Sequence, residues 1–440
     1  MATSENPPNP AYAAAQQSRA LRAFGRPVER RAFLDGVAER RTRRLPNGPG
    51  VDRVPIRLVD SESPRHLADR HARKVPVVAD ELIVPAGVTV DLPGLHLVAD
   101  AVPCCDEFDV YRVAPDARVD TIASWRLLRA TGVRLNGIAT LGDTVKGPDD
   151  PRPAKALGDH PGASADGDAP FVVLIDTGLA TDAHRDGWLH RPDVAPVDDN
   201  IDTDPVDAII AATGQPGSDH VIDPCAGHGT FVAGIIRRVA PYAKVRMLRA
   251  VDSEGFASDT MVARAICRSI AVFDEANGRG VLNLSLGGET PDDAVPPIIR
   301  CALDKLPKGV VVVAAAGNEP TGVPVWPAAA DGVESVAALG TDGLPAAWSN
   351  FGATVDFTVP GEGIVSTYVK GTDASGDVYA DDPFAIWSGT SFATPQVAAL
   401  IAQRLADDTQ ASASDVVQQM RDHQPDPDWG TIMPGIQLFG

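Results

Sequence analysis

The feature that most constrains the fold is a series of short, continuously apolar runs in the second part of the 440-residue chain. These runs are rich in β-branched residues and alternate with stretches of helical periodicity. Strands that are apolar on both sides are typical of a parallel sheet covered by helices on both faces. We therefore expect an α/β fold with three α/β/α layers around a central, mostly parallel sheet. The runs with strand character are 171–175, 244–248, 281–286 and 310–316, and the helical stretches are 229–238, 259–275 and 294–305.

The rest of the chain divides into segments that differ in amino-acid composition and periodicity. Residues 1–75 are rich in Arg, Pro and polar residues, which predicts a solvated, partly helical and partly disordered N-terminal arm. Residues 76–146 combine short alternating runs with one helical segment near 119–131, a pattern typical of a small α+β domain. Residues 147–170 hold five prolines and few aliphatic residues, which predicts a linker. The α/β domain then spans 171–440.

The balance of charge and hydropathy excludes two classes of partner. The net charge is −20, and phosphate binding needs a basic surface, so no nucleic-acid partner is expected. No apolar run approaches the roughly 18–20 residues that a membrane span requires, so no membrane partner is expected either. The N-terminus also lacks the charged-then-apolar order of a secretory signal.

The cysteines give a further expectation about the compartment. There are five, an odd number, and no pair has CxxC spacing, so the sequence predicts neither a disulfide framework nor a zinc site. Free thiols in a reducing compartment are the simpler interpretation, and we expect a cytoplasmic location. We interpret Cys225 as a small buried side chain rather than a redox switch.

Four polar residues stand where strands end or helices begin. In an open parallel sheet, sites form beyond the carboxyl ends of the strands. Asp176 directly follows the first apolar run and Asn318 follows the last, whereas His228 and Ser391 each open a helical stretch. Each residue has a structural alternative: a turn-capping aspartate, a structural histidine, an N-cap serine and a turn asparagine.

The position of Ser391 suits a catalytic role as well as an N-cap. In the first turn of a helix, backbone N–H groups without a helical partner can stabilise an oxyanion. Pro395 fits the start of such a helix, because its missing N–H breaks no bond there. Glycines on both sides of His228 let backbone and substrate approach the imidazole closely.

The strings DTG, GHGTFVAG, LSLGG, AAAGNE and GTSFATP follow one another along the chain, and in this order they resemble the signature strings of the subtilase family of serine peptidases. The resemblance covers about residues 171–405. It implies a subtilisin-like domain and a serine endopeptidase that works through an acyl-enzyme. It also implies that Ser391 is the nucleophile, His228 the general base, Asp176 the residue that orients the imidazole, and Asn318 an oxyanion donor.

The same resemblance implies two backbone edges that hold an extended peptide, at 285–287 and 314–316. A glycine on one edge and alanines on the other favour a large apolar substrate side chain between them. The expected substrate-binding residues are Ser285, Leu286, Gly287, Ala315, Gly317 and Thr390.

The N-terminal part has two interpretations. Subtilases often carry an α+β propeptide that blocks the groove until it is cut away, and residues 76–146 have a suitable size and position. Intramolecular inhibition by this segment is one interpretation, and a permanent docking or recruitment module is the other. A propeptide predicts self-cleavage within 147–170.

The chain departs from many subtilases between Asp176 and the helix that follows His228. An acidic run within 177–227 is either a solvated surface loop or a cation site. The longer loop that many subtilases use to bind calcium tightly is absent after GHGT. We therefore expect no metal and no cofactor.

The main alternative function is a catalytically silent subtilase scaffold that acts as a peptide-binding module. Such a scaffold would usually have lost a catalytic residue, and all four are present. An esterase would need a G-x-S-x-G string around its serine. A sedolisin-like acid peptidase would use an acidic base, which the GHGT string argues against.

Overall fold

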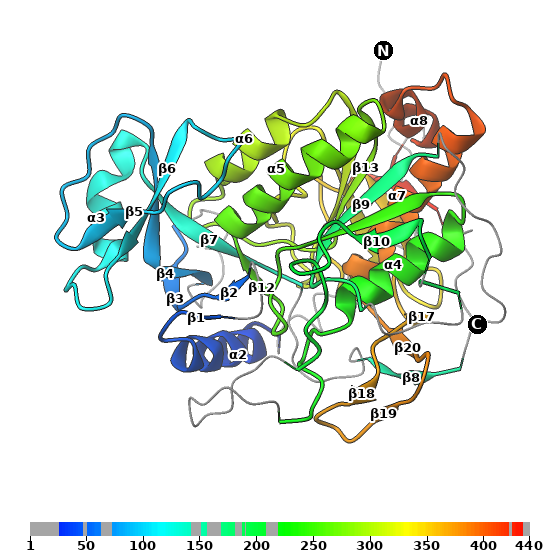
Figure 1. Cartoon of the computed structure of the whole chain (residues 1–440), viewed down its shortest axis with the longest axis horizontal. Coiled ribbons are helices and arrows are strands. Elements are labelled where there is room, and N and C mark those ends of the chain that lie inside the picture. Colours follow the sequence, from blue (N-terminus) through cyan, green and yellow to red (C-terminus); the bar gives the residue numbers. More distant parts are fainter. Residues whose placement is uncertain are drawn as a thin grey trace, which may run out of the picture.

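The computed structural model describes residues 26–46, 51–62, 73–141, 151–155, 169–180, 187–189, 191–207, 219–421 and 425–433. The main sheet in this part of the chain has eight strands, and every neighbouring pair is parallel (Figure 1). In order across the sheet, the strands are β10 (Val194–Pro196), β11 (Lys244–Arg249), β9 (Phe171–Asp176), β13 (Arg279–Leu284), β14 (Gly309–Ala315), β15 (Val333–Leu339), β16 (Phe357–Pro360) and β21 (Thr431–Ile432).

Helices cover both faces of this sheet, as Figure 1 shows. On β9, alternate residues enter opposite cores. Val172 and Leu174 belong to the core shared with α4 and α7, and Val173 and Ile175 belong to the core shared with α5 and α6. The three expected layers are confirmed. The helices are α4 (His228–Val239), α7 (Thr390–Asp407) and α8 (Ala413–Met420) on one side, and α5 (Asp259–Glu275) and α6 (Pro297–Asp304) on the other.

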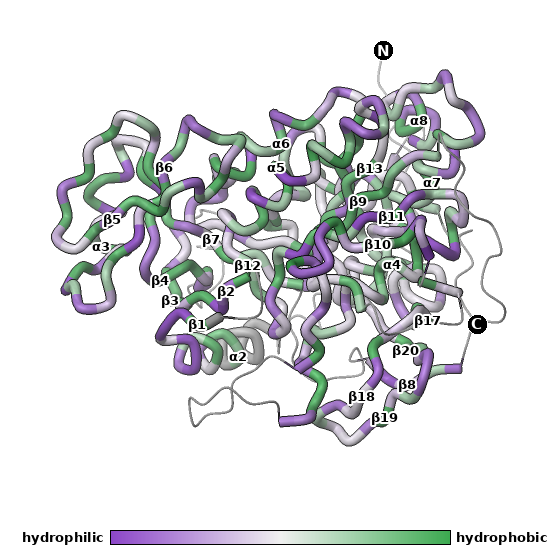
Figure 2. Tube along the Cα trace, in the orientation of Figure 1, coloured by the Kyte–Doolittle hydropathy of each residue, from purple (hydrophilic) through white to green (hydrophobic). Residues whose placement is uncertain are grey.

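The apolar runs on which the prediction was based form the central strands of the sheet. The four predicted strands correspond to β9, β11, β13 and β14, and the three predicted helices correspond to α4, α5 and α6. Hydrophobic residues follow β9 and β13 in Figure 2, whereas polar residues dominate the outer loops. Burial on both faces explains why these strands read as continuous apolar runs rather than alternating ones.

A second, antiparallel sheet is formed mainly by residues 56–140. Helix α3 (Thr121–Leu128) packs on it through Trp125, and the Asp120 carboxylate caps the helix by accepting from two backbone N–H groups. This matches the expected small α+β unit, but the unit begins earlier than residue 76, because β3 pairs with β4. The strands are β3 (Ile56–Asp60), β4 (Lys74–Pro85), β5 (Leu95–Leu97), β6 (Phe108–Val113) and β7 (Arg134–Thr140), with β12 (Phe256–Ser258) at the edge.

The region predicted as a solvated arm contains ordered structure that is partly buried. It holds α2 (Arg26–Arg40) and the short pair β1 (Leu45–Pro46) and β2 (Asp52–Arg53). Arg41 is fully buried and forms ion pairs with Asp252, at 2.7 Å, and Glu254. Burial alone would raise the pKa of the Glu254 carboxyl, but Arg41 and Arg53 outweigh it and lower that pKa. Local composition could not reveal these partners, because they lie about two hundred residues further along the chain.

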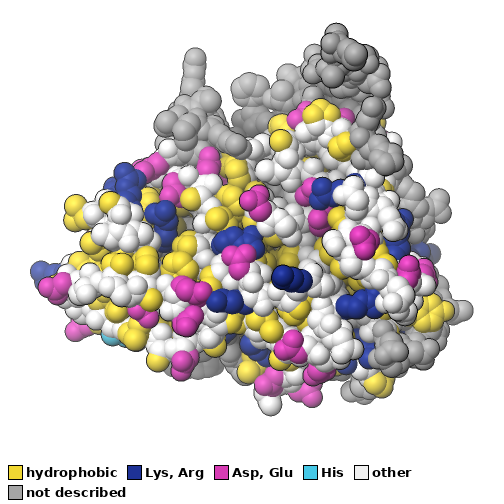
Figure 3. Space-filling model, turned by 90° about the horizontal axis from the view of Figure 1, so that it is seen from above, with side chains coloured by type: hydrophobic (Ala, Val, Ile, Leu, Met, Phe, Trp, Pro, Cys, Tyr) yellow, Lys and Arg dark blue, Asp and Glu magenta, His cyan; other side chains and the backbone are white. Residues whose placement is uncertain are grey.

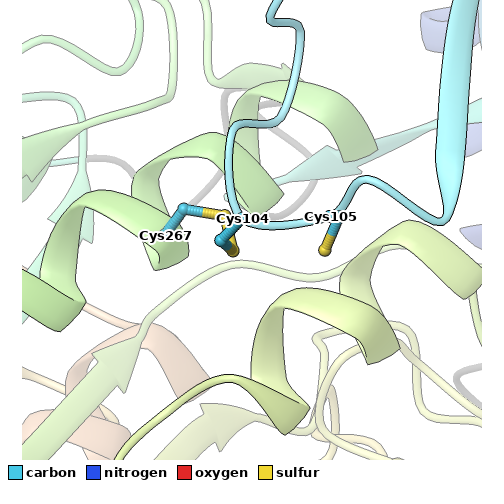
Figure 4. Close-up of side chains that lie close together, drawn as sticks. All are labelled: Cys104, Cys105 and Cys267. Carbon is cyan, nitrogen blue, oxygen red and sulfur yellow. A yellow bond between two sulfur atoms is a disulfide. The ribbon is translucent and has the colours of Figure 1, made fainter.

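Two disulfides join the N-terminal unit to the α/β domain, and here the cysteine prediction is wrong. Cys104 is bonded to Cys267 on α5, and the adjacent Cys105 is bonded to Cys301 on α6. Figure 4 shows Cys105 beside the Cys104–Cys267 bridge. The partners are 163 and 196 residues apart in sequence, so spacing carried no signal of them. Cys225 lies outside both bridges and is buried, as expected.

The remaining strands form small sheets beside the main one. The predicted linker contains β8 (Arg152–Ala154), which pairs with β20 (Phe384–Trp387), so this segment is anchored to the α/β domain. Strand β20 also pairs with β17 (Ile364–Thr367), and β18 (Gly371–Thr372) pairs with β19 (Val378–Tyr379). On the face seen in Figure 3, Lys and Arg side chains are scattered and do not gather into one patch. Among the described helices, none combines the length and the apolar character needed to cross a bilayer.

Candidate active site

Asp176 is the last residue of β9, at the carboxyl edge of the central sheet. Its carboxylate is fully buried and accepts the Thr177 backbone N–H at 2.7 Å. The next turn leads directly against the start of α4. A Cβ on Gly229 would lie 2.3 Å from the Gly178 carbonyl oxygen, so only glycine allows the strand end and the helix start to approach this closely.

His228 is the first residue of α4 and is 1% exposed. Its Nδ1 lies 2.8 Å and 3.0 Å from the two carboxylate oxygens of Asp176. Its Nε2 is buried and has no hydrogen-bond partner among the described residues. The imidazole packs against the rings of Trp387 and Phe392, with centroids 5.4 Å and 5.1 Å away. These contacts fix the ring with Nδ1 toward the carboxylate, which leaves Nε2 as the nitrogen available for chemistry.

Ser391 lies in the first turn of α7, a helix that packs against α4. It directly precedes Phe392, whose ring touches the His228 imidazole. Its hydroxyl donates to the Ser285 carbonyl oxygen at 2.9 Å and, more weakly at 3.4 Å, to the Leu141 carbonyl oxygen. These hydrogen bonds link His228 to Asp176 and direct the Ser391 hydroxyl toward backbone oxygens.

Asn318 lies close to the start of α7. Its side-chain oxygen accepts from the Thr390 backbone N–H at 2.9 Å and from the Thr390 hydroxyl at 2.8 Å. The Thr390 hydroxyl also accepts from the Gly317 N–H at 3.2 Å. Because its oxygen is held in this way, the Asn318 amide nitrogen is the end of the side chain left to donate a hydrogen bond. Thr390, predicted to bind substrate, lines the pocket and also orients the asparagine.

The other predicted binding residues gather around the same pocket. Leu286, Gly287, Ala315 and Gly317 line it together with Thr390 and Ser391. Ser285 is fully buried, and its hydroxyl donates to the Ser391 carbonyl oxygen at 2.8 Å. Ser285 therefore stabilises the backbone of Ser391.

The chain's own strand β7 occupies the groove beside Ser391. Thr140 and Gly287 exchange two backbone hydrogen bonds, of 2.8 Å and 2.9 Å. On its other side, β7 pairs antiparallel with β12, and the Leu141 N–H donates to the Gly255 carbonyl oxygen at 3.1 Å. Residues 138–141 are thus held as an extended peptide between two backbone edges, with the Leu141 carbonyl next to the serine hydroxyl.

One predicted edge is corrected by this pairing. The segment 285–287 does provide an edge, at Gly287. The second edge is β12, at Phe256–Ser258, and not 314–316, because Ala314 and Ala315 pair with β15 within the central sheet. Ala315 instead forms part of the pocket wall.

Part of the acidic run between Asp176 and His228 is buried structure. Asp202 receives a bidentate ion pair from Arg268, with distances of 2.9 Å and 2.7 Å. Asp204 is buried and accepts from the Thr177 hydroxyl and the Gly227 N–H at 2.9 Å and 2.8 Å. Burial raises the pKa of the Asp204 carboxyl to about 7. Asp204 thus links the turn after Asp176 to the residue before His228, a role that no sequence pattern indicated. The rest of the run, at 208–218, lies outside the described residues.

The sequence model of the subtilase family matches residues 167–424, well over half of the chain. The chain belongs to the subtilase family. It is 31% identical to thermitase from Thermoactinomyces vulgaris over 53% of this chain and 74% of that protein. It is 32% identical to subtilisin Savinase from Lederbergia lenta over 56% of this chain and 86% of that protein. This subtilase is a serine-type endopeptidase, and its substrates are proteins or peptides.

The sequence prediction missed the residues that the N-terminal unit brings to the site. Thr140 and Leu141 were read only as part of a small α+β domain, although they lie in the groove. Glu289 and Glu319 also line the pocket and were not singled out. Glu319 directly follows Asn318 in the AAAGNE string, so its position next to a predicted oxyanion donor was the one signal available.

Proposed function

We propose that this subtilase hydrolyses peptide bonds through a covalent acyl-enzyme, with Ser391 as nucleophile and His228 and Asp176 as its partners. The observation that carries the proposal is the short Nδ1 contact of the buried His228 with Asp176, on helix α4 that packs against the helix bearing Ser391. In that arrangement Nε2 takes the serine proton during attack and then protonates the leaving amine. Asp176 holds the tautomer and stabilises the imidazolium that forms.

Asn318 completes the proposal as the oxyanion donor. Its amide nitrogen and the Ser391 backbone N–H would hold the negative oxygen of the tetrahedral intermediate. Removal of one such donor costs about 10²–10³ in rate. Thr390 supports this role by holding the other end of the amide.

A fluorophosphonate reagent tests the nucleophile directly. We expect covalent labelling at Ser391 after the groove has been opened, because the reagent forms a bond only with a serine activated by a general base. His228→Ala should abolish the labelling. Peptide mapping by mass spectrometry identifies the modified residue. Absence of labelling at neutral pH would instead favour the silent peptide-binding scaffold.

We further propose that the N-terminal unit inhibits the enzyme within the same chain. The support is the strand β7, which fills the groove with both backbone edges paired and Leu141 at the nucleophile. A substrate cannot add a strand while β7 is present. Self-cleavage is then expected just after Leu141, closer to the groove than the 147–170 stretch that the sequence suggested.

The contact between Asp259 and β7 predicts a pH-dependent release of this unit. Asp259 is buried and accepts the Gly137 N–H at 2.9 Å, and burial raises the pKa of its carboxyl to about 7. After release the carboxyl is hydrated and its pKa returns to near 3.8. Protonated Asp259 therefore stabilises the docked state, and this stabilisation is fully present below pH values of about 4. It is lost progressively as the pH rises from about 4 to about 7. Affinity should fall about 10²-fold between pH 5 and pH 8.

Gel filtration of the self-cut and reduced protein at the two pH values measures this release. Asp259→Asn should make the docked fraction independent of pH over this range. Asp274→Asn, on the exposed end of the same helix, is the matched control and should behave like the wild type. Equal pH dependence in wild type and Asp259→Asn would exclude Asp259 as the titrating group.

We propose that nucleic acids and membranes are not partners, in keeping with the acidic composition. The cytoplasmic location stays a prediction, and it has lost one of its grounds. It rested on free thiols, whereas four of the five cysteines are paired. Structural disulfides persist mainly in oxidising compartments.

A further inference from the structure

A second asparagine holds the turn that carries Asn318. Asn350 lies between β15 and β16 and is 3% exposed. Its side-chain oxygen accepts the backbone N–H groups of Glu319 and Thr321, at 2.8 Å and 3.4 Å. Its side-chain nitrogen donates to the Ala316 carbonyl oxygen at 2.9 Å. These three bonds use both ends of the amide and fix its orientation.

Asn350 also binds both peptide groups that flank Asn318. The Glu319 N–H belongs to the peptide group that follows Asn318. The peptide group before Asn318 contains the Gly317 carbonyl oxygen, which accepts from the Asn350 backbone N–H at 2.9 Å. Each peptide group is planar, so holding the groups on both sides of a residue restricts both of its backbone dihedrals. Asn350 therefore limits the directions in which the Asn318 side chain can point.

The central sheet in turn holds Asn350. The Ser349 hydroxyl donates to the Asn350 carbonyl oxygen at 3.0 Å and accepts the Ala338 N–H of β15 at 3.0 Å. Gly317 permits the close approach of the turn: its φ is +108°, and a Cβ there would lie 2.6 Å from Asn350 Nδ2. The turn with Asn318 is thus fastened to a rigid element of the fold.

This support differs from the one that Thr390 gives. Thr390 holds the side-chain oxygen of Asn318, whereas Asn350 holds the backbone on both sides of it. Asn350 also lines the pocket that contains Ser391, but the turn takes up both ends of its amide. An oxyanion donor is effective when it is held in place before the reaction, and a misplacement of about 1 Å can cost about 10²-fold in rate.

We propose that Asn350 is a positioning residue for oxyanion stabilisation: it fixes the backbone of Asn318 so that the Asn318 amide nitrogen meets the negative oxygen of the tetrahedral intermediate. The inference rests on the proposed peptidase function and adds a residue to its machinery. The role is carried by hydrogen bonds to four residues of one turn, two of them on the peptide groups that flank the donor.

A double-mutant cycle with Asn318 tests the proposal. Each variant is cut by a trace of affinity-tagged wild-type enzyme, which is then removed, and is reduced so that the groove is open. Asn350→Ala should lower kcat for a peptide about 10- to 100-fold and leave KM within about threefold, because an interaction made only in the transition state is weakened. Asn318→Ala should lower kcat about 10²–10³-fold. The double variant should be at most about threefold slower than Asn318→Ala, because Asn350 acts through Asn318.

Asn350→Asp is a second variant of nearly the same shape. It keeps the acceptor for the two N–H groups and loses the donor to Ala316, so its kcat should fall less, by about three- to tenfold, and again only when Asn318 is present. Thr358→Val is the control for general destabilisation. It removes a buried hydrogen bond of 2.6 Å to the Trp429 carbonyl oxygen, and it should lower the thermal midpoint while kcat stays at the wild-type value.

The outcomes separate this inference from the function on which it rests. A loss of kcat that is equally large with and without Asn318, or a wild-type kcat in both Asn350 variants, overturns the positioning role alone. An enzyme that labels at Ser391 and keeps its kcat in Asn318→Ala overturns the proposed oxyanion donor and the positioning role together. An enzyme that neither labels at Ser391 nor cleaves any peptide overturns the whole proposed function.

Discussion

Ser391→Ala should lower peptide hydrolysis by about 10⁶-fold, the size of loss expected when the nucleophile of such a triad is removed. The same variant should remain one uncut polypeptide of 46.1 kDa, whereas the wild type should cleave its own peptide bond close to Leu141. Intact mass spectrometry after incubation, with reduction, gives both results at once. Asp176→Asn should cost less, about 10⁴-fold, because the imidazole stays in place but in the wrong tautomer.

Ser414→Ala is the matched control for this prediction. Ser414 is an exposed serine on α8, so its loss should change neither hydrolysis nor self-cleavage. Comparable hydrolysis by wild type and Ser391→Ala would exclude this serine as the nucleophile. A wild-type chain that labels at Ser391 but remains uncut would exclude self-processing while leaving peptidase activity intact.

The two disulfides should keep the N-terminal unit attached even after the chain is cut. Cys104 and Cys105 belong to the N-terminal unit, and their partners lie on α5 and α6 of the catalytic domain. A tethered segment acts at an effective concentration of about 1 mM, far above nanomolar enzyme. A dithiol reductant that converts both disulfides to thiols, while it is oxidised to a cyclic disulfide, should raise the activity of the cut enzyme by about 10²-fold or more.

Gel filtration and activity with and without dithiothreitol check this prediction. The cut protein should elute as one species without reductant and as separable fragments with it. Cys267→Ser combined with Cys301→Ser should separate without reductant, whereas Cys225→Ser, outside both bridges, should not. Release of the N-terminal fragment from the oxidised wild type would contradict the tether. Alkylation of all four paired cysteines without prior reduction would also contradict it.

The N-terminal unit illustrates how much of the structure can be predicted from the sequence. Its alternating runs and the helical segment near 119–131 predict an α+β unit, because strand and helix periodicity are local. Its occupation of the groove could not be predicted in the same way. The pairing of Thr140 with Gly287, and of Arg41 with Asp252, joins residues far apart in the chain, and no local pattern marks either partner.

The sequence by itself determined the α/β layers and four candidate catalytic residues. Apolar runs specify strands buried on both faces, and parallel strands bring their carboxyl ends, with Asp176 and Asn318, to one edge. Only the tertiary structure decided what lies in the groove and which cysteines pair. The physical reason is that these contacts depend on the long-range packing of two units, whereas strands and helices depend on neighbours along the chain.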